Sequence, residues 1–527
     1  MSQGAAIGID LGSTFSRVAV WQGDTVTIIP NSDGNWKTPT CVSYRDQGQV
    51  VGELALARAM LHSTSTITNV MRWIGRKFND PALQADILAN RVVRGASPDD
   101  YVAITVESDG EMRAVSPIEV VSMILGELKH AAEASLGMPV TDAVIAIPSS
   151  FHHAQREAVR EAAEMAGIHV LRILSAPTAA ACTQAIESSQ AQSTKYLGLV
   201  VDMGSATLDV ALVQIENGIA EVTAVAGETH LGGDDVDARL EAHVVAMLEA
   251  THAGIAHNTR AMRKLRVACE RAKRTLSSTA SATLEIESLV GDVDFRTTIT
   301  RTEVERLCTD VVVRVVACVE STLRDATTTQ VDNVMLLGGS RHVPQIRTRL
   351  LQLFPGKIKD TSDDVHDFVV ARGAAAHAAI LTGRDSPSLH DVLVIDATSF
   401  PLGLEIAGGD MAIVIPRGSS TPTKRTVDVT TTTDNQVQVL LQVFEGDAAR
   451  AFNNSFLGKL RLDGIPYMPA GMPRIQVTFE VDANSLVQVS AVETTSQTQR
   501  AIVITHVQGR PTTDTSAQVV FRDANGV

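Results

Sequence analysis

Two short turns in this sequence combine aspartate, glycine and hydroxylated residues, which are the residue types that can hold a phosphate. Asp202 lies in "VVDMGSATLDVALV", which predicts a strand, a tight turn and a second strand. Asp10 lies in the same pattern near the start of the chain, in "IGIDLGSTFSRVAV". The backbone N–H groups of such turns can bind phosphate oxygens, and the neighbouring carboxylate can hold Mg²⁺, usually through water.

The repetition of this pattern is more informative than either copy. A single turn of this kind is often a plain hairpin. Two copies about 190 residues apart, followed by a third glycine turn at Gly338-Gly339-Ser340, are typical of a nucleotide clamp. A duplicated strand-turn-strand unit predicts two related lobes that face a common cleft.

The rest of the chain divides into two textures. Up to about residue 385, short apolar strands mix with helical patterns, which indicates an α/β fold; the predicted helices span 116–137, 152–168, 234–254 and 258–278. Beyond it, segments such as "IQVTFEVDANSLVQVSAVE" alternate with period two, which predicts an antiparallel β domain.

Composition restricts the class of protein. The 527 residues carry a net charge of −15, which gives no support for binding to nucleic acid or to anionic membranes. No apolar run approaches the ~18 residues of a membrane span. The five cysteines are scattered and form no C-x-x-C pair, which fits a reducing compartment. Because the first strand begins directly after "MSQG", we expect no signal peptide and a cytoplasmic location.

Six motifs then carry a resemblance to a known family. The chain resembles the seventy-kilodalton heat-shock chaperones (DnaK-type) from about residue 4 to residue 507, through "IGIDLGSTFSRVAV", "VVDMGSATLDVAL", "THLGGDDVDARL", "ACERAKRTLSS", "VMLLGGSRHVPQI" and "DVLVIDATSFPLGLEIAGG". The resemblance implies an actin-like two-lobed nucleotide-binding domain at 1–386, a linker at 387–397, an antiparallel β-sandwich that binds peptides at 398–507 and a short tail at 508–527. ATP or ADP with Mg²⁺ is the implied cofactor.

The family's site residues are carried over by position. The metal carboxylates fall on Asp10 and Asp202, and with Thr207 and Asp209 these are the candidate catalytic residues. The implied nucleotide-binding residues are Gly12, Ser13, Thr14, Phe15, Gly204, Ser205, Ala206, Thr207, Glu270, Lys273, Arg274, Ser277, Gly338, Gly339, Ser340 and Asp367. The family's stacking arginine falls on His342, and the neighbouring Arg341 is an alternative.

Three departures concern the chemistry. The family's catalytic lysine falls on Met71, and its glutamate before the proline falls on Ala176. Its Gly-Gly-Gly turn is here Gly204-Ser205-Ala206, whose two added Cβ atoms would crowd a phosphate. Because phosphoryl transfer depends on positioned charges around the transition state, we predict that nucleotide binding is retained and hydrolysis is weak or absent. The alternative is that Arg72 or another base compensates.

The resemblance also implies residues for coupling and for peptide binding. The relay between the two domains would use Pro148, Arg156, Arg172, Leu393 and Asp396, with Arg172 receiving a J-domain protein. The peptide groove would be lined by Leu404, Ile406, Val429, Val439, Leu441 and Leu486, with Ala407 and Thr432 arching over it. Alternation alone cannot distinguish this groove from ordinary sandwich core. The chain ends about twenty residues past the sandwich, so we expect no helical lid.

Three functions remain open at this point. The first is an ATP-binding folding chaperone that handles unfolded or nascent polypeptide, with a J-domain co-chaperone and a nucleotide-exchange factor. The second is a non-hydrolysing scaffold that partners a J-domain protein, at the ribosome. The third, a sugar kinase of the actin-like superfamily, is disfavoured by the linker and the sandwich.

Overall fold

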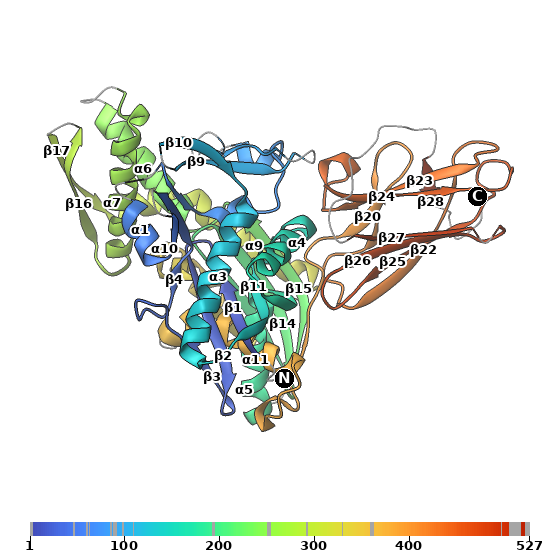
Figure 1. Cartoon of the computed structure of the whole chain (residues 1–527), viewed down its shortest axis with the longest axis horizontal. Coiled ribbons are helices and arrows are strands. Elements are labelled where there is room, and N and C mark those ends of the chain that lie inside the picture. Colours follow the sequence, from blue (N-terminus) through green and yellow to red (C-terminus); the bar gives the residue numbers. More distant parts are fainter. Residues whose placement is uncertain are drawn as a thin grey trace.

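The computed structural model describes most of the chain. The described residues are 4–45, 48–59, 62, 64–84, 87, 92–96, 100–108, 110–191, 195–249, 254–290, 293–328, 330–358, 363–496, 498–504 and 518–521. Figure 1 shows an α/β part that holds the N-terminus and an all-β part beside it that holds the C-terminus. The predicted order of an actin-like domain followed by a β-sandwich is confirmed.

The α/β part contains two sheets of the same plan. In each, one strand pairs antiparallel with the next strand and parallel with a later one. The first sheet has the order β12-β11-β1-β2-β3 with β4 on β2: β1 (Ala5–Leu11), β2 (Phe15–Gln22), β3 (Thr25–Ile29), β4 (Thr38–Pro39), β11 (Val140–Ile147) and β12 (His169–Ser175). The second has the order β18-β13-β14-β15-β19: β13 (Tyr196–Met203), β14 (Thr207–Glu216), β15 (Ile219–Thr229), β18 (Asn333–Leu337) and β19 (Leu393–Ile395).

Two alanine-rich helices pack between these sheets. They are α5 (Ala176–Ala191) and α11 (Asp363–Leu381), and they contact each other and both sheets. Gly373 lets them cross closely, since a Cβ at this position would lie 1.7 Å from the Ala179 carbonyl oxygen. The two glycine turns therefore lie at corresponding ends of two sheets that are held together through a tight helix crossing.

The remaining elements enclose this centre. Those of the first lobe are α1 (Glu53–Ala59), α3 (Pro117–Leu136), α4 (His153–Met165), η1 (Val70–Arg72), η2 (Pro81–Leu83), β5 (Cys41–Arg45), β6 (Gly48–Val51), β7 (Thr66–Thr68), β8 (Val92–Arg94), β9 (Val102–Ser108) and β10 (Glu111–Val115). Those of the second are α6 (Gly233–Glu249), α7 (Thr259–Ser278), α8 (Arg301–Leu307), α9 (Thr309–Asp325), α10 (Pro344–Leu353), η3 (Ile255–His257), η4 (Gly339–His342), β16 (Ser281–Val290) and β17 (Val293–Thr300).

The helix ends follow from local chemistry. The Ser116 hydroxyl caps α3 by accepting a hydrogen bond from the Ile118 N–H at 3.2 Å, and Gly137 ends the helix with a left-handed φ of 66°. None of the helices in the described part of the chain is both long and apolar enough to cross a membrane.

The all-β part is a sandwich of two sheets around one apolar core. The first sheet has the order β21-β20-β23-β24: β20 (Leu402–Glu405), β21 (Met411–Ile415), β23 (Gln438–Glu445) and β24 (Ser455–Asp463). The second has the order β27-β26-β25-β22-β28: β22 (Thr423–Thr431), β25 (Ile475–Val481), β26 (Val487–Glu493), β27 (Gln499–Ile504) and β28 (Val519–Phe521). Short 3₁₀ turns are η5 (Pro387–Leu389) and η6 (Ala451–Asn453). No α-helix occurs among the described residues after α11.

The C-terminal boundary differs from the sequence-based division. We predicted a tail at 508–527 outside the sandwich, but β28 lies within that range and pairs with β22. A segment of three residues carries too little sequence pattern to predict that it pairs with a strand distant in the sequence. Residues 505–517 and 522–527 lie outside the described part of the chain.

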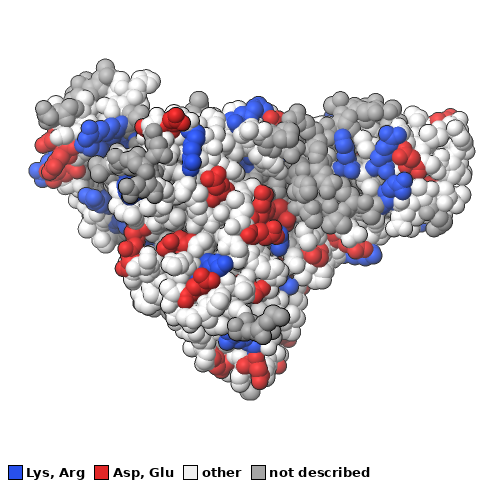
Figure 2. Space-filling model, in the orientation of Figure 1, with Lys and Arg blue, Asp and Glu red and all other residues white. Residues whose placement is uncertain are grey.

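The linker and the domain contact are well defined. β19, in the predicted linker, adds to the edge of the second α/β sheet by pairing parallel with β15. The Thr178 hydroxyl donates to Asp396 of the predicted linker at 2.7 Å, and across the domains the Ser420 hydroxyl donates to Glu221 at 2.9 Å. Charged side chains of both signs are interspersed over the face of the molecule in Figure 2.

Candidate nucleotide site and peptide groove

The two phosphate turns meet. Asp10 lies near the end of β1 and Asp202 near the end of β13, and each precedes its glycine turn. The Thr14 hydroxyl of the first turn donates to the Ser205 hydroxyl of the second at 2.6 Å. The second turn closes on itself through the Gly204 N–H, which donates to the Thr207 carbonyl at 3.0 Å. The structure therefore brings together the two devices that the sequence predicted as a pair.

The added side chains in the second turn differ in direction. Ala206 is buried, and its carbonyl accepts hydrogen bonds from the His230 and Leu231 N–H groups. The side chain of Ser205 reaches the first turn instead, through its bond to Thr14. Ser205 is therefore the substitution that narrows the space between the turns.

Three carboxylates gather behind the turns. Burial raises the pKa of Asp202 to about 8, and the nearby Asp209 and Asp10 charges contribute to this rise. Burial also raises the pKa of Asp209, opposed by hydrogen bonds that the carboxylate accepts, among them the Ser149 N–H at 2.7 Å. A cluster of this kind favours the approach of a cation.

One cation is already part of the fold. The Arg17 guanidinium lies 2.9 Å from the Asp10 carboxylate (Nη1–Oδ2), and it opposes the rise in the Asp10 pKa that burial causes. Arg17 also lies over the Phe368 ring, 5.9 Å from its centroid. The sequence analysis missed Arg17. The available signal was the hairpin register, which places Arg17 directly opposite Asp10 on β2.

The predicted adenosine residues lie on one face of α7 and around η4. Lys273 donates to Asp237 at 2.7 Å and to the Gly233 carbonyl at 3.1 Å, and Arg274 pairs with Glu270 at 2.5 Å. The neighbouring Ser277 hydroxyl donates to the Lys273 carbonyl at 3.4 Å, within α7.

The glycine turn before η4 faces the second phosphate turn. Only glycine fits at position 338, where φ is 74° and a Cβ would lie 2.2 Å from the Met203 carbonyl oxygen. The Ser340 hydroxyl, after Gly339, donates to the Gly204 carbonyl at 2.7 Å. These contacts join the third glycine turn to the second.

The two residues considered for stacking occupy different environments. Arg341 is buried and its guanidinium donates to Asp367 at 2.9 Å and to the Gly338 carbonyl at 3.2 Å. His342 is exposed. The Arg341 guanidinium is thus paired with Asp367. The exposed His342 lies at the position of the family's stacking arginine.

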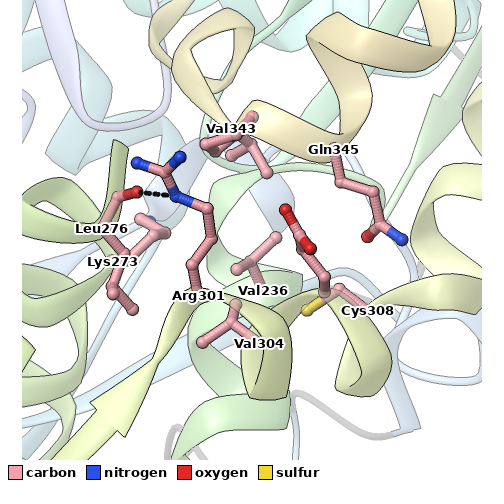
Figure 3. Close-up of a pocket in the computed structure, with 10 residues that line it drawn as sticks. Val236, Lys273, Leu276, Arg301, Val304, Cys308, Val343 and Gln345 are labelled. Atoms are coloured by element: carbon pink, nitrogen blue, oxygen red, sulfur yellow. Dashed lines mark hydrogen bonds between the residues drawn. The ribbon is translucent and has the colours of Figure 1, made fainter. Parts of the chain in front are cut away.

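A small cavity lies beside this wall (Figure 3). Its volume is about 20 Å³, close to the space of one water, and its lining includes Lys273, Val343 and Cys308. The Arg301 guanidinium crosses its edge and donates to the Leu276 carbonyl at 2.9 Å. The cavity is too small for a nucleotide base.

The two positions where the resemblance places the family's catalytic lysine and glutamate are both in apolar surroundings. Met71, in η1, is 1% exposed and belongs to the core of the first lobe. Ala176, at the start of α5, is 8% exposed and packs in the apolar cluster between the sheets. The Arg72 guanidinium lies 3.6 Å from Asp234 of α6 (Nη2–Oδ2), so its charge is directed across the cleft at that helix.

Among the predicted relay residues, Arg156 contacts both domains. The Arg156 guanidinium donates to the Phe151 carbonyl at 3.1 Å and to the Ser399 hydroxyl of the other domain at 3.3 Å. The Pro148 carbonyl accepts from the Phe151 N–H at 3.2 Å. Arg172 lies 3.0 Å from His377 (Nη1–Nε2).

Most of the predicted groove residues lie together. Leu404, Val429, Val439 and Leu441 are fully buried in the sandwich core. Ile406, Ala407 and Thr432 are partly buried beside them. Leu486 lies apart, lining a hollow of about 520 Å³ with residues such as Pro422 and Lys424.

Comparison with known proteins agrees with this architecture. The family described as "Hsp70 protein" matches residues 6–525. The chain is 40% identical over 510 residues to Heat shock cognate 70 kDa protein 3 of Dictyostelium discoideum, covering 96% of this chain and 81% of that protein. It is 42% identical over 512 residues to a Heat shock 70 kDa protein of Neurospora crassa (96% and 78%). It is 38% identical over 509 residues to a ribosome-associated molecular chaperone of Saccharomyces cerevisiae (96% and 82%). The chain therefore belongs to the Hsp70 family of chaperones.

Proposed function

We propose that this Hsp70-family protein binds ATP or ADP with Mg²⁺ between its two lobes and hydrolyses ATP weakly or not at all. The proposal rests on the contrast between the binding residues in the cleft, which are assembled, and the two positions expected to carry out hydrolysis, which are apolar. The two turns and three carboxylates are assembled, whereas Met71 and Ala176 are packed into apolar cores.

The residues present suit a hydrated divalent cation. The predicted metal carboxylates Asp10 and Asp202, together with the neighbouring Asp209, offer the oxygens that Mg²⁺ prefers. A cation would relieve the repulsion among them, which adds to the effect of burial on the Asp202 pKa. Within the described residues, no three His, Cys, Asp or Glu side chains are arranged to hold a metal directly, so we assign these contacts through water. Mg²⁺ would supply neutralisation of the phosphate charge, whereas Arg17 already offsets the charge of Asp10.

The expected loss of hydrolysis follows from charge placement. Removing one donor that stabilises the transition state typically costs about 10²–10³ in rate. Met71 offers no cation, and Ala176 no carboxylate to orient water. The Arg72 guanidinium is paired with Asp234 of α6, and this carboxylate already offsets part of the charge that Arg72 could offer to a phosphate.

Peptide handling and partners extend this proposal. An edge groove binds an extended chain through backbone hydrogen bonds and one apolar pocket, so unfolded or nascent polypeptide is the proposed client. A J-domain protein is the proposed partner at Arg172. The ribosome is a proposed partner because the similar protein of Saccharomyces cerevisiae is named a ribosome-associated molecular chaperone. The nucleotide-exchange factor and the cytoplasmic location stay predictions.

Calorimetric titration with ADP and Mg²⁺ tests the binding site. Lys273→Ala removes a charge on the adenosine side of α7, and we expect it to raise the Kd at least about tenfold, or 1.4 kcal/mol. Lys264→Ala is the matched control, since Lys264 lies on the same helix and donates to the Glu287 and Ser288 carbonyls away from the cleft. Equal affinity of both variants would place nucleotide elsewhere, and no binding by the parent protein would end the proposal.

A further inference from the structure

The strand β28 occupies the free edge of β22. It pairs antiparallel, with Val519 opposite Thr431, Val520 opposite Thr430 and Phe521 opposite Val429. The other edge of β22 is taken by β25. β28 is thus a three-residue segment added at the end of a five-stranded sheet, beside residues assigned to the peptide groove.

The backbone of this segment is also held from its other side. The Ala407 N–H donates to the Val519 carbonyl at 2.8 Å. The preceding Gln518 carbonyl accepts from the Gln436 side-chain amide at 3.1 Å and from the Thr432 hydroxyl at 3.4 Å. Ala407 and Thr432 are the two residues predicted to arch over the groove, so the segment passes beneath that arch.

One side chain of the segment fills the pocket. Val519 is 0% exposed and packs in the same apolar cluster as Leu404, Val429, Val439 and Leu441, four of the predicted groove residues. The side chains of Val520 and Phe521 are partly exposed. A segment with backbone hydrogen bonds on both sides and one buried apolar side chain is bound in the manner of an added peptide strand.

We propose that residues 518–521 are an intramolecular ligand of the peptide groove. This inference rests on the proposed function, because it takes the groove to be the peptide site. It also defines the ligand class: an extended segment that places a β-branched aliphatic residue in the pocket, with its backbone hydrogen-bonded to β22 and Ala407. An external polypeptide binds only by displacing the chain's own strand.

The competition is strong because the ligand is tethered. β27 ends at Ile504, so a short connection separates the sandwich from Gln518. Short connections of this kind give effective concentrations in about the millimolar range. Weakly binding peptides are therefore excluded, and a client must bind tightly or arrive as a long extended chain.

Fluorescence anisotropy with a labelled peptide of residues 516–522, Ser-Ala-Gln-Val-Val-Phe-Arg, tests the proposal on the full chain. Val519→Asp places a charge in the buried position and releases the strand, so we expect the variant to bind the peptide at least about tenfold more tightly than the parent protein, a change of about 1.4 kcal/mol. Val520→Asp, at the partly exposed neighbouring position, is the matched control and leaves the peptide Kd within about twofold, or 0.4 kcal/mol.

The outcomes distinguish the proposed intramolecular ligand from the proposed peptide role of the groove. Equal peptide affinity of the parent protein and Val519→Asp would overturn the inference while leaving the groove as a peptide site. No peptide binding by any of the three proteins would overturn the peptide role itself, and nucleotide titration would still report on the cleft. If Val519→Asp unfolds the sandwich, hydrogen exchange at the Val520 N–H of the parent protein, with and without excess peptide, decides, because displacement would release residue 520 from its pairing with Thr430. Exchange that is unaffected by peptide contradicts displacement. If the parent protein is a dimer on size exclusion and Val519→Asp is a monomer, the segment binds in the groove of a second copy. That result would contradict the intramolecular assignment.

Discussion

We predict that Glu445 makes the contact between the two domains dependent on pH. This carboxylate, at the end of β23, is partly buried against the nucleotide-binding domain and accepts a hydrogen bond from the His153 N–H at 2.8 Å. Burial raises its pKa from 4.5 to about 7, against the lowering effects of the His153 N–H and of the Arg156 charge. An apolar cluster around Ala154 and Phe444 surrounds the contact.

The magnitude follows from the two pKa values. An undocked domain would return Glu445 to its ordinary pKa of 4.5, whereas the docked state holds it at about 7. At about 1.4 kcal/mol for each tenfold change in proton affinity, the difference is at most about 3 kcal/mol. Because the docked pKa is raised, docking carries no such cost below pH 4.5, weakens as the pH rises toward 7, and stays weakened above it.

Small-angle scattering between about pH 4.5 and pH 8 measures the effect, since this range spans both pKa values of Glu445. We expect the parent protein to expand as the pH rises through this range, because undocking increases the radius of gyration. Glu445→Gln keeps an oxygen for the His153 N–H but carries no charge, so this variant should stay compact at the upper end of the range. Asp463→Asn, an exposed site on β24 of the same sandwich, is the control. An identical pH profile for Glu445→Gln and the parent protein would show that Glu445 does not control docking.

Three further predictions concern the cleft and its support. Ser205→Gly removes the hydroxyl bonded to Thr14 at 2.6 Å and opens the second turn, so we expect tighter ADP binding by calorimetry; weaker binding would show that the hydroxyl assists. Met71→Lys places an ammonium group in a fully buried apolar site, and we expect a loss of at least about 2 kcal/mol in urea unfolding without recovery of hydrolysis. Gly373→Ala forces a Cβ against the Ala179 carbonyl, so we expect a loss of about 1–3 kcal/mol by the same measurement; unchanged stability would contradict the close crossing.

The features predictable from the sequence were those encoded locally. Asp10 and Asp202 each precede a glycine turn, so their repetition could be read directly. The α3 helix begins and ends near where Ser116 and Gly137 predict, because caps act within one turn.

The features that escaped prediction depend on pairing across long separations. Arg17 meets Asp10 only through the register of β1 and β2. The burial of Met71 depends on the direction in which η1 presents its side chain. The place of β28 depends on hydrogen bonds to residues far earlier in the chain, such as that between Gln518 and Thr432. Pattern and propensity contain none of this information, since it is fixed by tertiary packing.

Single-turnover hydrolysis of MgATP by the full chain, with bound and free nucleotide separated at each time point, distinguishes nucleotide binding from hydrolysis. We predict stoichiometric binding with the ATP recovered intact, because Met71 and Ala176 supply neither the cation nor the carboxylate that the reaction needs. Conversion to ADP at the rate of an Hsp70 relative that retains the lysine and the glutamate, assayed in parallel, would contradict the account.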